Sequence, residues 1–371
     1  MFIEVHILQN FAPSNLNRDE SNSPKDCVFG GTRRARISSQ CIKRSIRSHP
    51  SFAEETEVEL ATRTRLLAVA VSTLLQAKGK ESEQADRAAQ DLVGSILGGM
   101  DAKKKEQSKV LFYASQEEKE MLAQRLLDVW NTLGEEKNRT EAITKIKDEF
   151  IKMFHNRTSA PEIAMFGRML AEEPKLSLDA AAQVAHAIST HRANMEFDFF
   201  TALDDLQKDG ETGAGMMGVV GFNAATFYRY ANVDFNQLLI NMDGNLDLAL
   251  KTLRGFLKAS ALAIPTGKQN SFAAQNPPSF LLAVVRKNGN TWSMANAFEK
   301  PVSLKGDSSQ LDASIEALDA YWGELQNFFG GEASSFVAMV GTNAALEYLQ
   351  PYVVTNFNAW VDGVIDEVER A

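Results

Sequence analysis

The sequence predicts an α+β fold in which a block of helices is inserted into a smaller domain built on a β-sheet. Residues 2–9 alternate between apolar and polar side chains, as a strand with one buried face does. Residues 50–155 have the apolar periodicity of helices almost throughout. Residues 195–230 consist of two extended arms around a glycine-rich tip, which is typical of a projecting hairpin.

The first strand places Ile3, Val5 and Ile7 on one side and Glu4 and His6 on the other. We therefore expect it to be half-buried, with His6 on its polar side. The polar residues 10–26 predict a loop. A second extended segment is expected to begin at Val28 and Phe29 and to lead into a Gly-Gly turn.

The helical block contains long apolar stripes separated by glycines and polar segments. It carries no motif that can be tied to chemistry. We expect helices over residues 54–78, 82–97, 116–133 and 139–154, with a short strand at 110–113.

The segments after the helical block return to a mixed pattern. Residues 161–170 predict a strand with Ile163, Met165, Gly167 and Met169 on one side, and residues 179–191 fit a helix or a strand equally well. The other expected elements are helices over 246–262, 311–329 and 357–368 and strands over 280–286 and 335–340.

The predicted hairpin has aromatic residues on its first arm and an acidic run near its tip. The second arm, residues 219–233, reads as a strand. The glycines of residues 210–218 predict a flexible tip. Three interpretations remain open: an apolar wedge against unstacked bases, a contact with another protein copy, or a surface loop without a partner.

The most informative stretch is residues 30–47, which is basic and contains no acid, although the whole chain has a net charge of -9. Its cations are Arg33, Arg34, Arg36, Lys43, Arg44 and Arg47. Gly30 and Gly31 allow a tight turn or a close approach to a ligand. Ser38 or Ser39 is a natural N-cap for a helix over residues 40–49.

A helix that starts at these serines would place Lys43 and Arg47 on one face, four residues apart. The free N–H groups of its first turn and the serine hydroxyls would favour a phosphate. A run of phosphates, the backbone of a nucleic acid, is therefore the best chemical match. The alternative is a solvated basic face without a ligand.

The composition limits the other classes of function. At 371 residues with 44% hydrophobic side chains, the chain can form a sizeable core. It has no apolar run close to the ~20 residues that cross a bilayer, and its first residues include an acid where a signal peptide is basic. We expect a cytoplasmic protein.

No catalytic or metal motif is visible. The five histidines do not form a metal-binding spacing, and the two cysteines, Cys27 and Cys41, are too few for a zinc site. We therefore expect no cofactor and favour a binding protein over an enzyme. His6 as a general base for RNA cleavage is the alternative, with a hydrogen-bonded structural histidine as its simpler interpretation.

Several blocks of the chain resemble the CasC family, the repeated backbone subunit of the Cascade surveillance complex in type I-E CRISPR systems. The resemblance is carried by residues 15–19, by Lys25 and Asp26, by residues 29–40 with Lys43 and Arg44, and by residues 165–169 and 183–189. It extends over essentially the whole chain. The block from Gly30 to Gln40 is its most specific part.

The resemblance implies a fold shaped like a right hand. It comprises an RRM-like (ferredoxin-like) palm over residues 1–50, 156–194 and 231–371, a helical finger insertion over 51–155 and a thumb hairpin over 195–230. It also implies that about six copies assemble head to tail along one CRISPR guide RNA. The thumb of one copy would displace a nucleotide held by the next, while other bases stay free to pair with target DNA.

The basic block and the resemblance together give the candidate RNA-binding residues. In the palm, phosphate contacts are expected, which fix register without reading sequence. Met165 and Phe200 match family positions that pack against the displaced nucleotide. The full set is Arg18, Lys25, Arg34, Ser38, Ser39, Gln40, Lys43, Arg44, Arg47, Met165, Arg168, Phe200 and Lys268.

The partners that the resemblance implies are a CRISPR guide RNA, the target DNA strand, neighbouring copies of the chain, and the large, small, 5′-end cap and 3′-end RNA-processing subunits of Cascade. The expected role is a non-catalytic one in antiviral defence. An RNA-processing endonuclease of the same RRM-like class is the main alternative. A helix-turn-helix DNA regulator is a weaker one.

Overall fold

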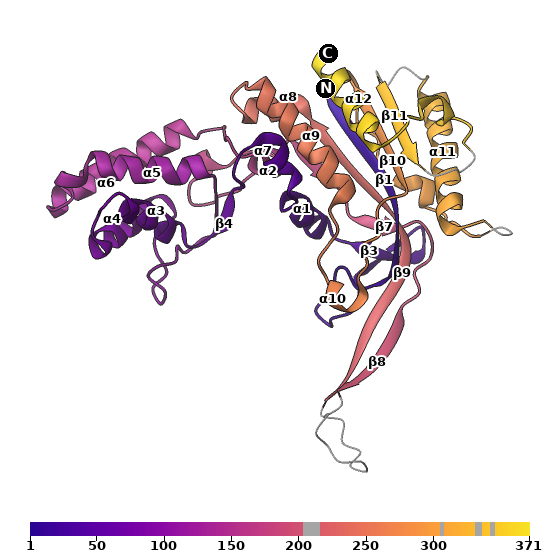
Figure 1. Ribbon diagram of the computed structural model, residues 1–371, viewed down its shortest axis with the longest axis horizontal. Coiled ribbons are helices and arrows are strands. Elements are labelled where there is room, and N and C mark those ends of the chain that lie inside the picture. The colour runs from indigo at the N-terminus through magenta and orange to yellow at the C-terminus, as the bar shows by residue number, and fades with distance from the viewer. Residues whose placement is uncertain (203–215, 305–307, 331–335, 342–345) are drawn as a thin grey trace, which may run out of the picture. The chain divides into compact units, whose positions relative to one another are not determined.

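The computed structural model describes residues 1–202, 216–304, 308–330, 336–341 and 346–371 (Figure 1). The chain divides into two compact units. Residues 1–49, 184–232 and 256–371 form the first, here called the sheet unit, and residues 50–183 and 233–255 form the second, the helical unit. Residues 156–183 and 233–255, assigned to the palm by the resemblance, thus group with the helical block. The predicted α+β class is confirmed.

A large antiparallel sheet forms the centre of the sheet unit, in the order β11-β10-β1-β9-β7-β3-β2. Strand β1 (Phe2–Ser14) lies between β10 (Phe280–Arg286) and the long β9 (Met216–Asp234). The other strands are β11 (Phe336–Gly341), β7 (Ala187–Ser189), β3 (Thr32–Ile37) and β2 (Asp26–Phe29). The predicted strands 2–9, 219–233 and 280–286 are confirmed, and so is the strand expected at 335–340 over its described residues, 336–340. Residues 179–191 contain two short strands, β6 (Ala182–Val184) and β7, and no helix.

Both faces of β1 are covered, so the prediction of a half-buried strand is wrong. On one face, Val5 and Ile7 line the same small cavity as Ile42 and Ile46 of α1 (Ser39–Arg47). On the other face, Leu8 belongs to a core that includes side chains of α11 (Gln310–Phe329). The side chains of β1 alternate between its two faces as predicted, but helix α11 covers the face that carries the polar residues.

Glu4 and His6 therefore lie in a buried polar network. The Glu4 carboxylate accepts hydrogen bonds from Arg286 Nε (2.7 Å) and from the Trp292 backbone N–H (2.6 Å). His6 Nδ1 lies 2.9 Å from the Tyr228 hydroxyl. Burial raises the pKa of Glu4, but hydrogen bonds from His6 and Arg286 outweigh it and leave the pKa lowered. Burial lowers the pKa of His6, which favours the neutral ring.

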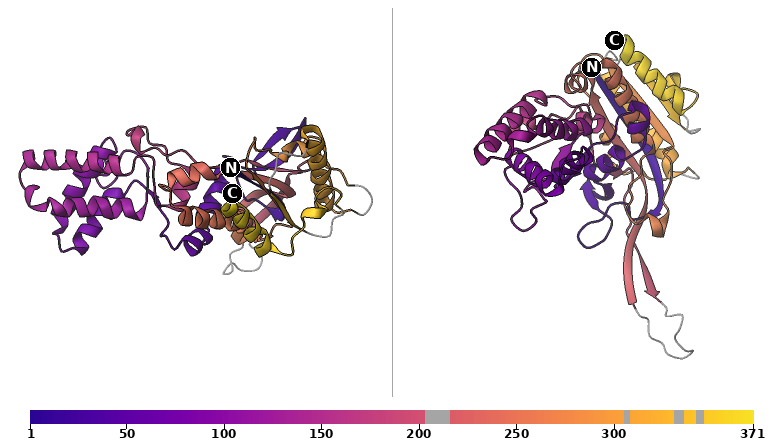
Figure 2. Two further views of the ribbon diagram at one scale, coloured as in Figure 1. Left: turned by 90° about the horizontal axis from the view of Figure 1, so that it is seen from above. Right: turned by 60° about the vertical axis from the view of Figure 1, so that its left-hand side comes forward.

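The predicted hairpin is formed by β8 (Glu196–Ala202) and the first part of β9, paired from Glu196↔Phe222 to Ala202↔Met216. It extends beyond the rest of the sheet (Figures 1 and 2). The acidic run and most of the predicted glycine-rich tip fall within residues 203–215, outside the described residues.

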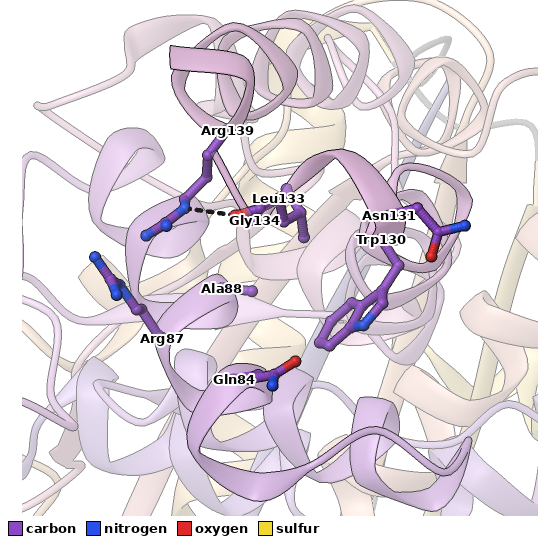
Figure 3. Close-up of a pocket in the computed structure, with 8 residues that line it drawn as sticks. All are labelled: Gln84, Arg87, Ala88, Trp130, Asn131, Leu133, Gly134 and Arg139. Atoms are coloured by element: carbon purple, nitrogen blue, oxygen red, sulfur yellow. Dashed lines mark hydrogen bonds between the residues drawn. The ribbon is translucent and has the colours of Figure 1, made fainter. Parts of the chain in front are cut away.

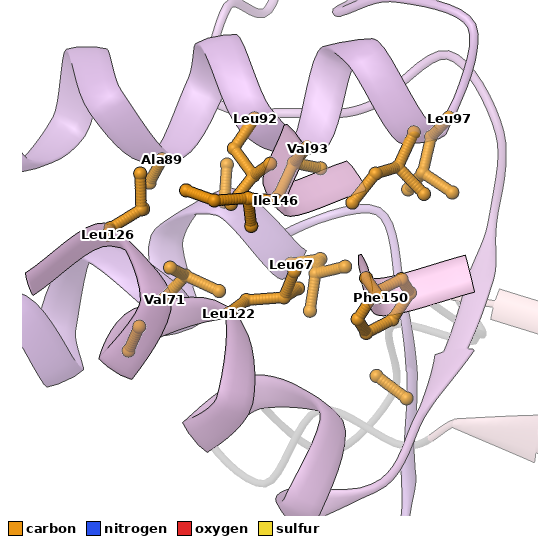
Figure 4. Close-up of a cluster of buried hydrophobic side chains, with 14 of the residues drawn as sticks. Leu67, Val71, Ala89, Leu92, Val93, Leu97, Leu122, Leu126, Ile146 and Phe150 are labelled. Atoms are coloured by element: carbon orange, nitrogen blue, oxygen red, sulfur yellow. The ribbon is translucent and has the colours of Figure 1, made fainter. Parts of the chain in front are cut away.

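The helical unit has its own apolar core, shown in Figure 4. Its main helices are α3 (Leu67–Ala77), α4 (Ser82–Ile96), α5 (Gln116–Asp128) and α6 (Glu136–Met153). Labelled in that core are Leu67, Val71, Ala89, Leu92, Val93, Leu97, Leu122, Leu126, Ile146 and Phe150. The expected helices 82–97, 116–133 and 139–154 are thus confirmed within a few residues, because each has an apolar stripe to bury.

Two predictions fail in this unit. The single helix expected over residues 54–78 is broken: α2 (Ser51–Thr56) ends at Glu57 in the left-handed conformation, and β4 (Thr62–Thr64) pairs with β5 (Phe112–Ala114) before α3 begins. The strand expected over 161–170 is instead helix α7 (Pro161–Phe166), which begins at a proline and ends at Gly167 with a φ of 75°.

The remaining helices are α8 (Phe235–Asn241), α9 (Leu246–Leu262), α10 (Gln269–Phe272) and α12 (Phe357–Arg370). The predictions for 246–262, 311–329 and 357–368 are confirmed by α9, α11 and α12. Within the part of the chain that the structure describes, every helix is too short or too polar to cross a membrane.

Candidate nucleic-acid interface

The turn from β3 into α1 is held by contacts from two distant loops. Ser38 is the N-cap of α1, and its hydroxyl accepts a hydrogen bond from the Cys41 N–H at 3.3 Å. The Ser38 N–H donates to Asn17 Oδ1 at 2.8 Å, and Asn17 O accepts from the Lys25 N–H at 2.9 Å. The predicted cap and helix are confirmed, and the turn fixes the backbone of Lys25.

His186 holds the other side of the same turn. Its Nδ1 accepts hydrogen bonds from the Ser39 N–H (3.1 Å) and lies 3.3 Å from Arg36 Nη1. Because both groups are donors, Nδ1 is the acceptor of the ring and Nε2 carries the proton. Burial and the charges of Arg36 and Lys25 lower the pKa of His186, which is consistent with a neutral ring that donates through Nε2.

A hollow of about 700 Å³ opens beside this turn. Arg18, Lys25 and Arg36 supply its positive charges. Three acids also line it: Asp19 accepts hydrogen bonds from Ser21 and Ser23, Asp26 pairs with Arg33, and Glu20 is exposed. The Arg18 guanidinium contacts Asn22 Oδ1 at 2.7 Å, which leaves it without an acidic partner in the described residues.

Helix α1 adds cations next to Lys25. Burial raises the pKa of the Cys41 thiol, and the positive charges of Arg44 and Lys25 oppose this effect. Gln40 and Arg44 are exposed, and Ser39, Lys43 and Arg47 are partly exposed. Across the described ranges, Lys25, Lys43 and Arg44 make no ion pair with an acid of the chain. Their charge is therefore available to an anionic ligand.

Lys268 joins this cluster through a tight backbone contact. A Cβ on Gly267 would lie 2.3 Å from the Leu16 carbonyl oxygen and 2.9 Å from that of Asn15, so only glycine fits there. Lys268 itself is partly exposed and has a φ of 51°. The close approach places Lys268 next to the segment that contains Asn17 and Arg18.

Arg34, which was predicted to bind RNA, instead stabilises the fold through hydrogen bonds to the protein's own backbone. It is fully buried, and its guanidinium donates to the carbonyl oxygens of Ser189 (3.0 Å), Thr190 (2.9 Å), Phe298 (2.7 Å) and Glu299 (3.0 Å). A Cβ on Gly30 would lie 1.7 Å from the same Glu299 oxygen. The Gly-Gly turn thus permits close packing against the protein's own backbone.

Arg168 and Met165, in the helical unit, also differ from prediction. Arg168 is buried and donates to Glu118 Oε1 (2.5 Å), to the Tyr113 carbonyl (2.9 Å) and to the Leu176 carbonyl (2.8 Å). Met165 is completely buried in α7. Met169, the other methionine of the same motif, is 91% exposed. Burial therefore argues against Met165 and Arg168 as RNA contacts and favours Met169.

Phe200 lies on the hairpin, paired with Gly218. A Cβ on Gly218 would lie 2.4 Å from its ring, so the glycine lets the ring lie across the neighbouring strand. Phe200 is 40% exposed, and Phe197 and Phe199, which alternate with it, are 65% and 61% exposed. Both faces of the hairpin thus present aromatic surface.

His6 is not positioned as a general base. It is completely buried and hydrogen-bonded to Tyr228 and Glu4, so it does not reach solvent. Among the described residues, no three His, Cys, Asp or Glu side chains gather as a metal site would require.

Three residues of this interface were absent from the predicted set: Asn17, Arg36 and His186. Each lies inside a block that carries the family resemblance. The resemblance therefore marks the segments that contain these residues. It does not show that Asn17 and His186 hold the turn, because their hydrogen bonds to Ser38 and Ser39 join segments that are distant in the sequence.

Comparisons with known proteins place the fold of the chain. A solved chain titled "CRISPR RNA-guided surveillance complex, pre-nicking" is 29% identical, with a TM-score of 0.84, over 99% of this chain and 100% of that chain. A chain titled "CRISPR RNA-guided surveillance complex" shares the fold at 24% identity and a TM-score of 0.74, over 99% and 100% of the two chains. No curated protein matches the sequence. The family model described as "CT1975-like protein" matches residues 3–360, and the chain therefore belongs to that family.

Proposed function

We propose that this chain is a non-catalytic backbone subunit of a type I-E CRISPR surveillance complex, of the CasC kind. It binds the phosphates of the guide RNA and leaves the bases free to pair with target DNA. About six copies assemble head to tail along one guide, together with the other Cascade subunits. The solved relatives, both titled as RNA-guided surveillance complexes, support this proposal.

The observation that carries the proposal is the group of cations around α1. Lys25, Lys43 and Arg44 have no acidic partner in the described residues, although the chain carries an excess of acids. Arg18 and Lys268 lie in adjoining segments. A protein with net charge -9 that keeps such a cluster unpaired has a binding surface for a polyanion.

The rigid support of this cluster favours the backbone of RNA over its bases. The Ser38 cap and the His186 contact to Ser39 fix the position of the first turn of α1. Fixed cations and N–H groups hold phosphates in register but do not distinguish bases. This suits a guide strand whose sequence varies while its protein does not.

The exposed apolar side chains supply the second kind of contact. Phe200 on the hairpin and Met169 in the helical unit are candidates for packing against a displaced nucleotide. Met169 replaces Met165 in this role because Met165 has no exposed surface. Stacking of a base on an aromatic side chain is worth ~1–3 kcal/mol and tolerates any sequence.

The test is a salt titration of RNA binding by the full-length chain. Lys43→Ala combined with Arg44→Ala should weaken binding of single-stranded RNAs of unrelated sequence to the same degree. The slope of log K against log salt should shrink by about 1.4, or 0.7 for each lost phosphate contact. The control, Lys145→Ala with Lys152→Ala, removes the same charge from exposed positions of α6.

An unchanged slope in the α1 variant, or an equal loss in the control, would contradict the phosphate site. Cleavage of the guide that depends on His6 would favour the endonuclease alternative instead. Preference for duplex DNA of one sequence would favour the regulator.

A further inference from the structure

The helical unit contains a second hollow, of about 340 Å³, that no part of the proposed RNA site uses. It lies between α4, the 3₁₀ turn Trp130–Thr132 and the start of α6. Gln84, Arg87, Trp130, Asn131 and Arg139 provide its polar and aromatic lining (Figure 3). A volume of this size is within the range of small-molecule sites.

The charged groups that line this hollow are all positive. Arg139 Nε donates to the Leu133 carbonyl at 3.0 Å and its Nη1 lies 3.4 Å from Asp91, so this arginine is held in place by the protein. Arg87 is exposed and has no hydrogen bond or ion pair with any described residue. Figure 3 shows the two arginines on the same side of the hollow. Arg87 is therefore the group free to bind an anion.

Trp130 forms the opposite side of the hollow (Figure 3). It is only partly buried, and the Lys80 ammonium lies 4.9 Å from the centre of its ring. Part of the indole packs against the apolar core of the unit, and its exposed part can stack on a flat aromatic ring such as a base. The side-chain amides of Gln84 and Asn131 offer both donors and acceptors. The lining therefore combines a stacking surface, hydrogen-bonding edges and a cation.

We propose that this hollow binds a nucleotide, with the base against Trp130 and the phosphate on Arg87. The chemistry fits a free nucleotide or one nucleotide of a single strand. The site lies within one compact unit and does not depend on the proposed guide-RNA function.

The full-length chain labelled with 5-fluorotryptophan gives a direct test, because it has four tryptophans and Trp130→Phe identifies one ¹⁹F signal. Titration with AMP should shift the Trp130 signal saturably and leave those of Trp322 and Trp360, which are buried, unchanged. Arg87→Gln should weaken AMP binding about tenfold or more. The control Arg63→Gln removes an exposed arginine elsewhere in the unit and should have no effect.

Parallel titrations with AMP and with a short oligo(dT) distinguish a free nucleotide from a nucleotide within a single strand as the ligand. A shift with AMP supports a site for free nucleotides, and a shift with oligo(dT) alone supports a site for a strand. The proposal is wrong if neither ligand shifts the signal, if inorganic phosphate or a poly-glutamate peptide acts as well as AMP, or if Arg87→Gln binds normally while its melting curve is unchanged.

Discussion

Strand β3 and helix α1 are consecutive and similarly rich in cations, but they use this charge differently. In β3, Arg33 pairs with Asp26, Arg34 donates to four backbone carbonyls, and Arg36 donates to the Asp26 carbonyl and contacts His186. In α1, Lys43 and Arg44 have no acidic partner in the described residues. A strand inside a sheet brings its side chains close to acceptors of its neighbours, whereas a surface helix directs one face toward solvent. The density of charge in a sequence therefore does not reveal how much of it can bind a ligand.

The strongest test of this contrast is Arg34→Met against Arg44→Met. Loss of Arg34 removes a donor from four backbone carbonyls, of which that of Thr190 keeps a hydrogen bond from the Val302 N–H. The free energy of unfolding should therefore fall by about 3 kcal/mol. Arg44→Met should change it by less than about 0.5 kcal/mol. Urea unfolding measures both. The contrast fails if Arg34→Met folds with unchanged stability and loses RNA affinity.

Gly267→Ala tests whether the protein's own packing positions Lys268. The added Cβ would meet the Leu16 carbonyl, so the loop must move, at a cost of about 1–3 kcal/mol in stability. RNA affinity should fall as well. Gly134→Ala is the control, because nothing lies within 4 Å of its added Cβ. Equal behaviour of the two variants in thermal melting would refute the close contact.

Acidification tests the buried network beneath α11. The folded pKa of His6 is below its usual 6.5, so below that pH the unfolded chain binds a proton that the folded chain does not. Stability should therefore fall with decreasing pH, by up to about 1.4 kcal/mol per pH unit from this group. The pKa of Glu4 is lowered from 4.5, so the stability that its ionised carboxylate contributes is lost only at more acidic pH.

His6→Gln should flatten the slope of stability against pH below 6.5, since it removes the titrating group. His186→Gln, a partly exposed histidine of the interface, serves as the comparison. If the urea midpoints of the wild type and His6→Gln showed the same pH dependence, His6 would not be the group that lowers stability at acidic pH.

The smallest expected effect concerns the two methionines of one motif. Met169→Ala should leave stability unchanged and weaken RNA binding by roughly 1 kcal/mol, the scale of a sulfur contact with an aromatic ring. Met165→Ala should instead destabilise the fold, because it empties buried volume. Fluorescence anisotropy and thermal melting separate the two outcomes. Reduced RNA affinity for Met165→Ala alone would favour the original assignment.

Prediction from the sequence worked best where local rules decide. The Ser38 cap, the helix after it and the long amphipathic helices follow from capping and apolar periodicity, which depend on near neighbours. It failed where the outcome depends on distant contacts. The strand expected at 161–170 is a helix whose residue Met165 is fully buried. The polar face of β1 is buried because α11, some three hundred residues later, covers it.

The sequence by itself determined the α+β class, the basic character of residues 30–47 and the helix that follows Ser38, because each depends on composition or on residues within a few positions. Only the tertiary structure decided which cations remain available. Arg34 and Arg168 contact acceptors from remote segments, while the side chains of Lys25, Lys43 and Arg44 have no ion-pair partner among the described residues. A guanidinium binds whichever acceptors surround it, and the folded chain decides whether these are its own carbonyls or those of a ligand.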